Sequence, residues 1–164
     1  MKLQKIVSHL QKLHPKEIDL SLDRIKILCE KLGNPQNKIR SISVVGTNGK
    51  QSTINAIFSI LKEAKVKCNV YTSPHIQKIN ERFVFNNEML NDNELIDLFD
   101  EVEKINDQNP LTFFEALSAC YFYKAAQYPN NINLIEAGLF HRFDATNILK
   151  NNLASIVCSI SKDH

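Results

Sequence analysis

A lysine and two hydroxyl residues follow a glycine-containing turn near position 50, and this arrangement can bind a phosphate group. The segment 43–53 reads Ser-Val-Val-Gly-Thr-Asn-Gly-Lys-Gln-Ser-Thr. β-Branched residues before Gly46 predict a buried strand, and the apolar periodicity from Ser52 onward predicts a helix. Backbone N–H groups and the helix dipole at such a junction attract anions. Lys50 would add a point charge beside the terminal phosphates, and Ser52 could ligate Mg²⁺ through its hydroxyl group.

The spacing of this loop differs from the general phosphate-binding loop, G-x-x-x-x-G-K-[ST]. Val44 stands where the first glycine of that loop would be, and Gln51 separates Lys50 from the hydroxyl residue. We expect Thr47-Asn48-Gly49 to form the tight turn, because Asn and Gly tolerate a positive φ. The spacing, together with the lack of a guanine-reading Asn-Lys-x-Asp segment, disfavours a P-loop kinase or GTPase. An ordinary strand-turn-helix with a surface lysine is the alternative interpretation.

Polar side chains also follow two other predicted strands. Residues 68–71 form one apolar run, which ends in Thr72-Ser73-Pro74-His75, and residues 132–135 form another, which ends in Glu136. In open α/β sheets, ligands bind at the carboxyl ends of the strands. An acid there, opposite a phosphate loop, suits a Mg²⁺ ligand or an anchor for water. The alternatives are a surface histidine for His75 and a salt-bridged strand end for Glu136.

Helical patterns alternate with these strands, which predicts an α/β fold: a mostly parallel sheet with right-handed crossovers, flanked by helices. In the last predicted helix, Thr112 and Glu115 fit a capping box, which gives Glu115 a purely structural role as one interpretation. The remaining elements that we expect are helices at 1–13, from the N-cap Ser21 to Gly33 and at 92–106, and strands at 83–85 and 153–159.

Length, charge and cysteine content limit the class of protein. The 164 residues suffice for one domain with a core, since a domain of this size buries roughly 70% of its unfolded surface. A formal net charge of +2 without a basic block does not suggest nucleic-acid binding. No apolar stretch reaches transmembrane length. The four scattered cysteines read as reduced thiols in the core, so we expect a cytoplasmic protein.

Several separated motifs resemble those of the folylpolyglutamate synthase/dihydrofolate synthase family, within the Mur ligase superfamily. The phosphate loop alone would leave Mur ligases open, but Thr-Ser-Pro-His and Asp-Ala-Thr-Asn favour the folate branch. By this resemblance, residues 1–164 form an incomplete N-terminal ATP-binding domain, and the C-terminal glutamate-binding domain is absent. The motifs stand in the family's order at His14–Leu20, Gly46–Lys50, Tyr71–His75, Asn80–Arg82, Thr112–Glu115 and Asp144–Asn147.

The resemblance implies an ATP-dependent carboxylate–amine ligase of folate biosynthesis. ATP would phosphorylate a carboxylate of dihydropteroate or a folyl-glutamate, and the amine of L-glutamate would then attack the acyl phosphate. It further implies ATP and Mg²⁺ as cofactors, small-molecule partners, no nucleic acid or membrane partner, and a monomer at full length. The implied catalytic residues are Lys50, Glu136 and His164; the Mg²⁺ ligands are Ser52, Glu136 and His164; the nucleotide-binding residues are Gly46, Thr47, Asn48, Gly49, Lys50, Gln51, Ser52 and Thr53; and the substrate-binding residues are Thr72, Ser73, Pro74, His75, Glu81, Arg82, Phe114 and Glu115.

The chain departs from the family's pattern at three places. Gln51 replaces a glycine, and we expect its side chain to project away from the phosphates at the first helical turn. Residues 138–142 read Gly-Leu-Phe-His-Arg instead of Gly-Leu-Gly-Gly-Arg, so the path of that loop should differ. Family members are also more than twice as long, so we expect this chain alone not to complete the reaction. A non-catalytic nucleotide-binding fragment and a domain of a Mur-type peptide ligase remain alternatives.

Overall fold

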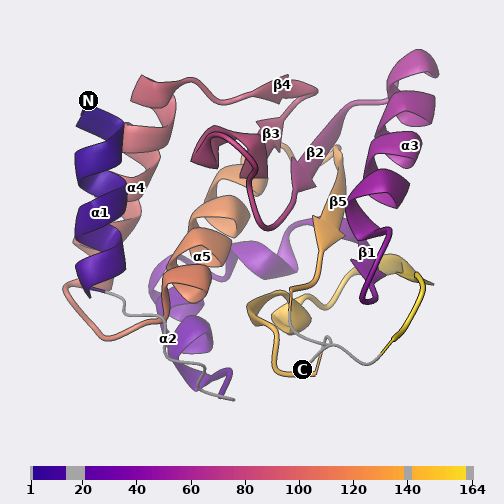
Figure 1. Ribbon diagram of the computed structural model, residues 1–164. Helices are drawn as coiled ribbons and strands as arrows, with labels where there is room; N and C mark the ends of the chain where they lie inside the picture. The colour runs from indigo at the N-terminus through magenta and orange to yellow at the C-terminus, as the bar shows by residue number, and fades with distance from the viewer. Residues whose placement is uncertain (1, 14–20, 139–141, 162–164) are drawn as a thin grey trace.

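Six strands form one mixed sheet in the computed structural model, which describes residues 2–13, 21–138 and 142–161 (Figure 1). Their spatial order is β4-β3-β2-β5-β1-β6. Strands β2, β5, β1 and β6 are parallel, which confirms the prediction, while β3 and β4 add an antiparallel hairpin at one edge. The strands are β1 (Arg40–Val45), β2 (Cys68–Tyr71), β3 (Phe83–Phe85), β4 (Glu88–Met89), β5 (Ile132–Glu136) and β6 (Asn152–Val157).

Helices cover both faces of this sheet. Helix α3 packs on β1, β2 and β5, while α2, α4 and α5 pack together on the opposite face and α1 packs against α4 (Figure 1). Among the described residues, no helix is long and apolar enough to cross a membrane. The α-helices are α1 (Lys2–Leu13), α2 (Asp23–Lys31), α3 (Lys50–Glu63), α4 (Asp92–Asn106) and α5 (Phe113–Ala125), and three short 3₁₀ helices are η1 (Pro35–Asn37), η2 (Ile79–Arg82) and η3 (Ala145–Ile148).

Two hydrophobic clusters lie on the two faces of the sheet. The larger one joins the sheet to α2, α4 and α5, and aromatic rings fill its centre, with Tyr71 stacked on Tyr121 at a centroid distance of 4.8 Å. The smaller one lies under α3 and contains Val44, Ile54 and Leu134. Helix α5 is buried on nearly all sides, which explains why most of its residues are apolar.

The parallel register brings the carboxyl ends of three strands to one edge. Val44 of β1 lies opposite Glu136 of β5, and Ile135 of β5 lies opposite Tyr71 of β2. The segments that follow these strands therefore start side by side. These are the segments in which the sequence places the phosphate loop, Glu136 and the 72–75 loop.

Three predicted boundaries were wrong by one or two residues. Helix α3 begins at Lys50 rather than Ser52, because Gly49 takes a left-handed N-cap conformation with φ of 84°. Helix α2 begins at Asp23 with Leu22 as N-cap, although the Ser21 hydroxyl still accepts the N–H of Asp23 at 3.1 Å. Strand β6 ends at Val157 rather than at residue 159, where the chain turns to contact the phosphate loop.

The four cysteines are free thiols, as predicted. Cys29, Cys68 and Cys120 are buried, and Cys158 is half-buried. Burial raises the pKa of the Cys29 thiol to about 12, so this side chain acts as a small apolar group.

A network of buried amides crosses the sheet at the opposite end from the phosphate loop. Asn69 of β2 donates to the side-chain oxygen of Asn133 on β5 at 3.0 Å, and the Tyr121 hydroxyl donates to the same oxygen at 3.0 Å. The amide nitrogen of Asn133 donates to the backbone oxygen of Arg40 at 3.0 Å. Because the side chains of Asn69, Tyr121 and Asn133 are fully buried, this network fixes the register of three strands and ties α5 to them.

Replacing Asn133 with alanine should destabilise the protein by about 3 kcal/mol, because buried donors and a carbonyl would lose their partners. Chemical denaturation of the wild-type and Asn133→Ala proteins measures this difference. The exposed Asn93 on α4 provides the control, since Asn93→Ala should change the free energy of unfolding by no more than about 0.5 kcal/mol. Equal stabilities of the two variants would contradict the role given to the network.

Candidate functional site

Lys50 and Glu136 form a buried ion pair at the carboxyl edge of the sheet. Lys50 Nζ lies 3.7 Å from Glu136 Oε1, and the two side chains are 15% and 5% exposed. The ammonium group also donates to the backbone oxygens of Gly46 at 2.8 Å and of Thr47 at 3.3 Å. Glu136 therefore faces the phosphate loop at the strand ends, as the sequence predicted, and it is salt-bridged there, as the alternative interpretation of this residue had it.

The carboxyl group of Glu136 sits in a poorly solvated place. Burial raises its pKa, while the backbone N–H of Ser73, which donates to Oε2 at 3.1 Å, and the charges of Lys50 and Arg82 lower it. Burial is the largest of these effects, so the net shift is upward. A further cation close to Glu136 would favour its ionised form.

Two glycines shape the phosphate loop. Gly46 has φ of 140°, and a Cβ atom there would lie 2.9 Å from Cys158 Cβ, so a side chain cannot be accommodated without a shift. Gly49 has φ of 84° in the left-handed region that favours glycine. Asn48 does not share that conformation. The loop therefore turns on its glycines, and the positive φ that we expected for Asn48 is wrong.

The segment after β6 occupies part of the loop's hydrogen-bonding capacity. The backbone N–H groups of Thr47 and Asn48 donate to the oxygen of Ser159 at 2.9 and 3.3 Å. The Thr47 hydroxyl exchanges hydrogen bonds with the backbone of Ser161. These two amides are thus directed at the protein itself, which differs from the expectation that the amides of the whole loop face an anion.

The N-terminus of α3 offers the amides that remain. Thr53 is the first residue to donate along the helix, to the oxygen of Gly49 at 2.9 Å, so the N–H groups of residues 50–52 precede the helical ladder. The Thr53 hydroxyl contacts Cys158 Sγ at 3.4 Å, whereas the Ser52 side chain is exposed. Of the two hydroxyls, that of Ser52 is therefore the one open to a ligand. Gln51 is half-buried in the same turn.

The 72–75 loop is held by an arginine–histidine pair. Arg82, which is only 8% exposed, donates from Nε to His75 Nδ1 at 2.9 Å. Burial and the neighbouring charge of Arg82 lower the pKa of His75, so its ring is neutral at pH 7 and Nδ1 can accept. The Thr72 hydroxyl donates to the backbone oxygen of Glu81 at 3.4 Å. Arg82 thus lies beside the carboxyl edge of the sheet, close enough for its charge to act on Glu136.

The Glu81 carboxylate is already used within the loop. It accepts the backbone N–H groups of Ile76, Gln77 and Lys78 at 2.8, 2.9 and 2.8 Å. These bonds lower its pKa, which keeps it ionised. Glu81 thus shapes the turn that leads from His75 to Arg82.

Phe114 and Glu115 lie at the start of α5 but have different surroundings. Glu115 forms the predicted capping box with Thr112 and also an ion pair with Arg24 of α2. Phe114 is half-buried and lies near Gly138, where an added Cβ atom would be 3.6 Å from its ring and 3.5 Å from Ser73 Oγ. Phe114 and Ser73 therefore approach the end of β5 together.

Two residues of this region were given no role from the sequence. Asp144, fully buried, accepts the backbone N–H of Gly138 at 2.6 Å and bonds the Thr146 hydroxyl at 2.5 Å. Its Asp-Ala-Thr-Asn motif was a signal, but spacing alone does not show that the side chain turns back to Gly138. Arg24 gave no local signal, because its partner is 91 positions away.

Some predicted positions lie outside the described residues. These are His164, the 14–20 segment and residues 139–141, which include the altered glycine positions. Within the described ranges, no group of three or more His, Cys, Asp or Glu side chains could hold a metal ion. A Mg²⁺ ion here would have few protein ligands, which is usual where substrate phosphates and water complete its coordination.

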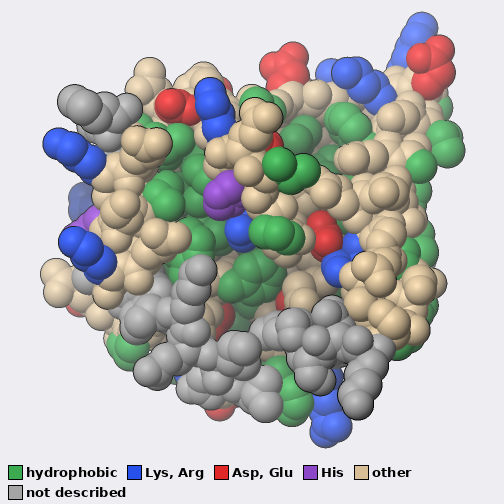
Figure 2. All heavy atoms as spheres, in the orientation of Figure 1, with side chains coloured by type: hydrophobic (Ala, Val, Ile, Leu, Met, Phe, Trp, Pro, Cys, Tyr) green, Lys and Arg blue, Asp and Glu red, His purple; other side chains and the backbone are tan. Residues whose placement is uncertain are grey.

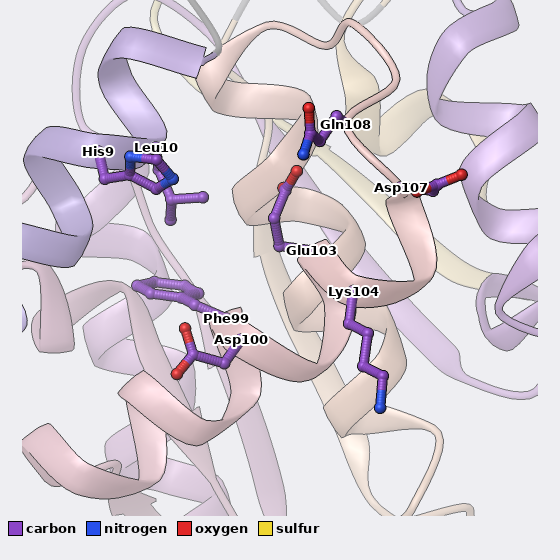
Figure 3. Close-up of a pocket in the computed structure, with 8 residues that line it drawn as sticks. All are labelled: His9, Leu10, Phe99, Asp100, Glu103, Lys104, Asp107 and Gln108. Atoms are coloured by element: carbon purple, nitrogen blue, oxygen red, sulfur yellow. The ribbon is translucent and has the colours of Figure 1, made fainter.

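Other concave regions lie away from Lys50. His75 borders one cavity of about 560 Å³ between α1 and the 77–80 segment. Another cavity, of about 680 Å³, lies between α1 and the C-terminal part of α4 and contains none of the predicted site residues (Figure 3). It is lined by His9, Leu10, Phe99, Asp100, Glu103, Lys104, Asp107 and Gln108.

The surface carries charges of both signs. On the face seen in Figure 2, charged side chains of both signs are interspersed, which matches the small net charge.

Comparisons with known proteins point to one family. No protein-family profile matches the chain. The dihydrofolate synthase/folylpolyglutamate synthase of Escherichia coli (strain K12) is 38% identical over 160 residues, which are 96% of this chain and 37% of that protein. The enzyme of the same name from Bacillus subtilis (strain 168) is 37% identical over 150 residues, which are 87% of this chain and 35% of that protein.

Solved structures show the same likeness. E. coli FolC in complex with DHPP and ADP has a TM-score of 0.90 at 34% identity, covering 99% of this chain and 39% of that one. Mycobacterium tuberculosis folylpolyglutamate synthase complexed with ADP has a TM-score of 0.90 at 30% identity, covering 99% of this chain and 37% of that one. The chain therefore resembles the folylpolyglutamate synthase/dihydrofolate synthases in sequence and fold along nearly its whole length, and it spans a little over a third of theirs.

Proposed function

We propose that this chain supplies the ATP and Mg²⁺ site, and part of the pterin site, of a ligase in folate biosynthesis. The ligase joins L-glutamate to dihydropteroate or to a folyl-glutamate. The observation that carries the proposal is the buried Lys50–Glu136 pair next to the open N-terminus of α3, at the carboxyl ends of parallel strands. The names of the relatives and the ligands bound in the similar structures support this choice.

On the nucleotide side, the start of α3 binds phosphate through the amides of residues 50–52. Lys50 exchanges its contacts with the Gly46 and Thr47 carbonyls for phosphate oxygens, which form stronger, charge-assisted hydrogen bonds. Glu136 keeps the ammonium group oriented from the opposite side. Charge that develops on the transferring phosphoryl group is then stabilised by groups that are in place beforehand.

Ser52, Glu136 and His164 would hold Mg²⁺, which supplies neutralising charge to the phosphates when bound. The residues fit this ion in two respects. Glu136 is a buried acid whose raised pKa falls when a cation approaches, and Ser52 presents an open hydroxyl in the first turn of α3. His164 lies outside the described residues and enters through the family resemblance alone.

On the substrate side, we place the 72–75 loop, Glu81, Arg82, Phe114 and Glu115. Phe114 offers a ring on which a flat pterin can stack. In the first step, an oxygen of the substrate carboxylate attacks the terminal phosphorus of ATP, and ADP leaves. In the second step, the amine of L-glutamate attacks the acyl carbon and phosphate leaves, while the amine loses one proton and the amide forms.

Several wider statements belong to the same proposal. The described residues share one sheet, which supports treating residues 1–164 as one nucleotide-binding domain. Four free thiols fit a reducing compartment such as the cytoplasm. A monomeric full-length protein, the lack of nucleic-acid partners and the inactivity of this chain by itself stay predictions.

Changing Lys50 to alanine should weaken ATP binding by about 1.5–3 kcal/mol, because a charge-assisted contact with phosphate is lost. This corresponds to roughly 10- to 150-fold in Kd. Isothermal titration calorimetry with Mg-ATP measures the change. The control is Lys62→Ala, at the far end of the same helix, which should bind ATP as the wild type does. Unchanged affinity in Lys50→Ala would remove this lysine from the phosphate site.

Changing Glu136 to glutamine should selectively remove the contribution of Mg²⁺ to nucleotide binding. The amide retains an oxygen for the N–H of Ser73, so the fold of the edge is kept, but it lacks the charge that attracts the ion. We expect ADP affinity in EDTA to be within about threefold of wild type, and the enhancement by Mg²⁺ to fall by about tenfold. If Mg²⁺ strengthens binding equally in both proteins, Glu136 is not a ligand.

A further inference from the structure

Arg24 of α2 reaches across to the first turn of α5. Its Nε lies 3.1 Å from Glu115 Oε2 and its Nη2 lies 3.1 Å from Glu115 Oε1, so the pairing is bidentate. The arginine side chain is 23% exposed and the glutamate side chain 6%. A carboxylate gripped at both oxygens has little freedom to rotate.

The same carboxylate also fixes the backbone at the start of α5. Glu115 Oε2 accepts the N–H of Thr112 at 2.6 Å, and the N–H of Glu115 donates to the Thr112 hydroxyl at 3.2 Å. This capping box needs no arginine, since Thr112 and Glu115 satisfy each other. Arg24 therefore adds a tie between α2 and α5, at positions far apart in the chain.

Stabilisation of α5 alone does not explain, on electrostatic grounds, why an arginine stands at position 24. A cation near a helix N-terminus opposes the helix dipole, whereas the Glu115 carboxylate is favoured there without help. Ion pairs that are partly buried also lose hydration, so their net gain is small. A bidentate arginine does fix the position of the turn that it contacts, which here is the first turn of α5.

Between Thr112 and Glu115, the two ends of this capping box, lie the buried Phe113 and the half-buried Phe114. The Phe114 ring faces Gly138 at the end of β5, and its centroid lies 6.0 Å from that of Tyr71 at the end of β2. The phenyl ring of Phe114 has no group that an ion pair or a conventional hydrogen bond could hold. The direction of the ring therefore depends on its packing against Tyr71 and on the backbone of residues 112–115, and hence on the groups that fix that backbone.

We propose that Arg24 is a positioning residue for substrate binding: through Glu115 it holds the first turn of α5 so that Phe114 presents its ring to the pterin. This rests on the proposed function, because it takes the substrate to be a dihydropteroate-like molecule. On this route Arg24 acts through Glu115 and Phe114, whereas the nucleotide side is built from other elements, α3 and β5.

Calorimetric titration of the full chain with dihydropteroate, and separately with Mg-ATP, tests the proposal. Arg24→Ala should bind dihydropteroate about tenfold more weakly and ATP within about twofold of wild type. Arg24→Lys should recover only part of the loss, because an ammonium group cannot grip both carboxylate oxygens. The control is Lys26→Ala on the same helix, where a 54% exposed side chain pairs only loosely with Asp23, and both affinities should be unchanged.

A double-mutant cycle with Phe114→Ala separates positioning from general destabilisation. If Arg24 acts through the ring, Arg24→Ala should change dihydropteroate affinity by less than about twofold in the Phe114→Ala background. Additive losses, or equal losses of ATP and dihydropteroate affinity, would overturn the proposal. Wild-type affinity in both Arg24 variants would overturn it as well while leaving the proposed function standing. A wild-type chain that binds ATP but not dihydropteroate would instead refute the pterin site and this inference with it.

Discussion

The parallel pairing of β1 with β5 is the constraint on which the site depends. It sets Val44 opposite Glu136, so that the loop after β1 must begin beside a carboxylate. Burial there is costly for both charges, and burial raises the pKa of Glu136 by more than the Ser73 N–H and the charge of Lys50 lower it. A buried pair of this kind is weak evidence for stability. The proposed function gives it another role, as charge held in place for a ligand that carries both signs, such as a nucleotide with its metal ion.

Strand β6, which pairs with β1 on the side opposite β5, determines which backbone N–H groups of the phosphate loop are used within the protein. Cys158 follows β6 and donates its N–H to Val45 at 2.8 Å, and Ser159 then accepts the amides of Thr47 and Asn48. Close contact with Cys158 leaves room only for glycine at position 46. These contacts hold the loop in place on its β6 side, and the backbone N–H groups of residues 50–52, which precede the helical ladder, lie in the first turn of α3. A loop held in this way loses less entropy when a ligand binds.

The sequence predicted most of the fold because its signals were local. Short β-branched runs, capping residues and the acid-rich face of α4 each identify their own element, and alternation of strands with helices implies the parallel sheet. The placement of Lys50 and Glu136 was predicted as well, because it depends on where neighbouring strands end. Spacing could not show that Ser159 would take two loop amides, that Asp144 would fold back onto Gly138, or that Arg24 would find Glu115. Those contacts join residues far apart in the chain, and only the packed structure brings them together.

Glu115 illustrates how a structural role and a functional one can share a residue. Its carboxylate closes the capping box and binds Arg24, so little of its hydrogen-bonding capacity is left for a substrate. Under the proposed function, the Thr112–Glu115 segment nevertheless lies near the pterin. The two statements agree if the segment acts through its shape: Glu115 holds the backbone and Phe114 makes the contact. Glu81 follows the same logic in the 76–82 turn: three backbone N–H groups occupy its half-buried carboxylate, while the next residue, Arg82, is buried within electrostatic reach of Glu136. In both segments an acid sets the backbone, and the proposed function leaves the contact with substrate to the neighbouring aromatic or basic side chain.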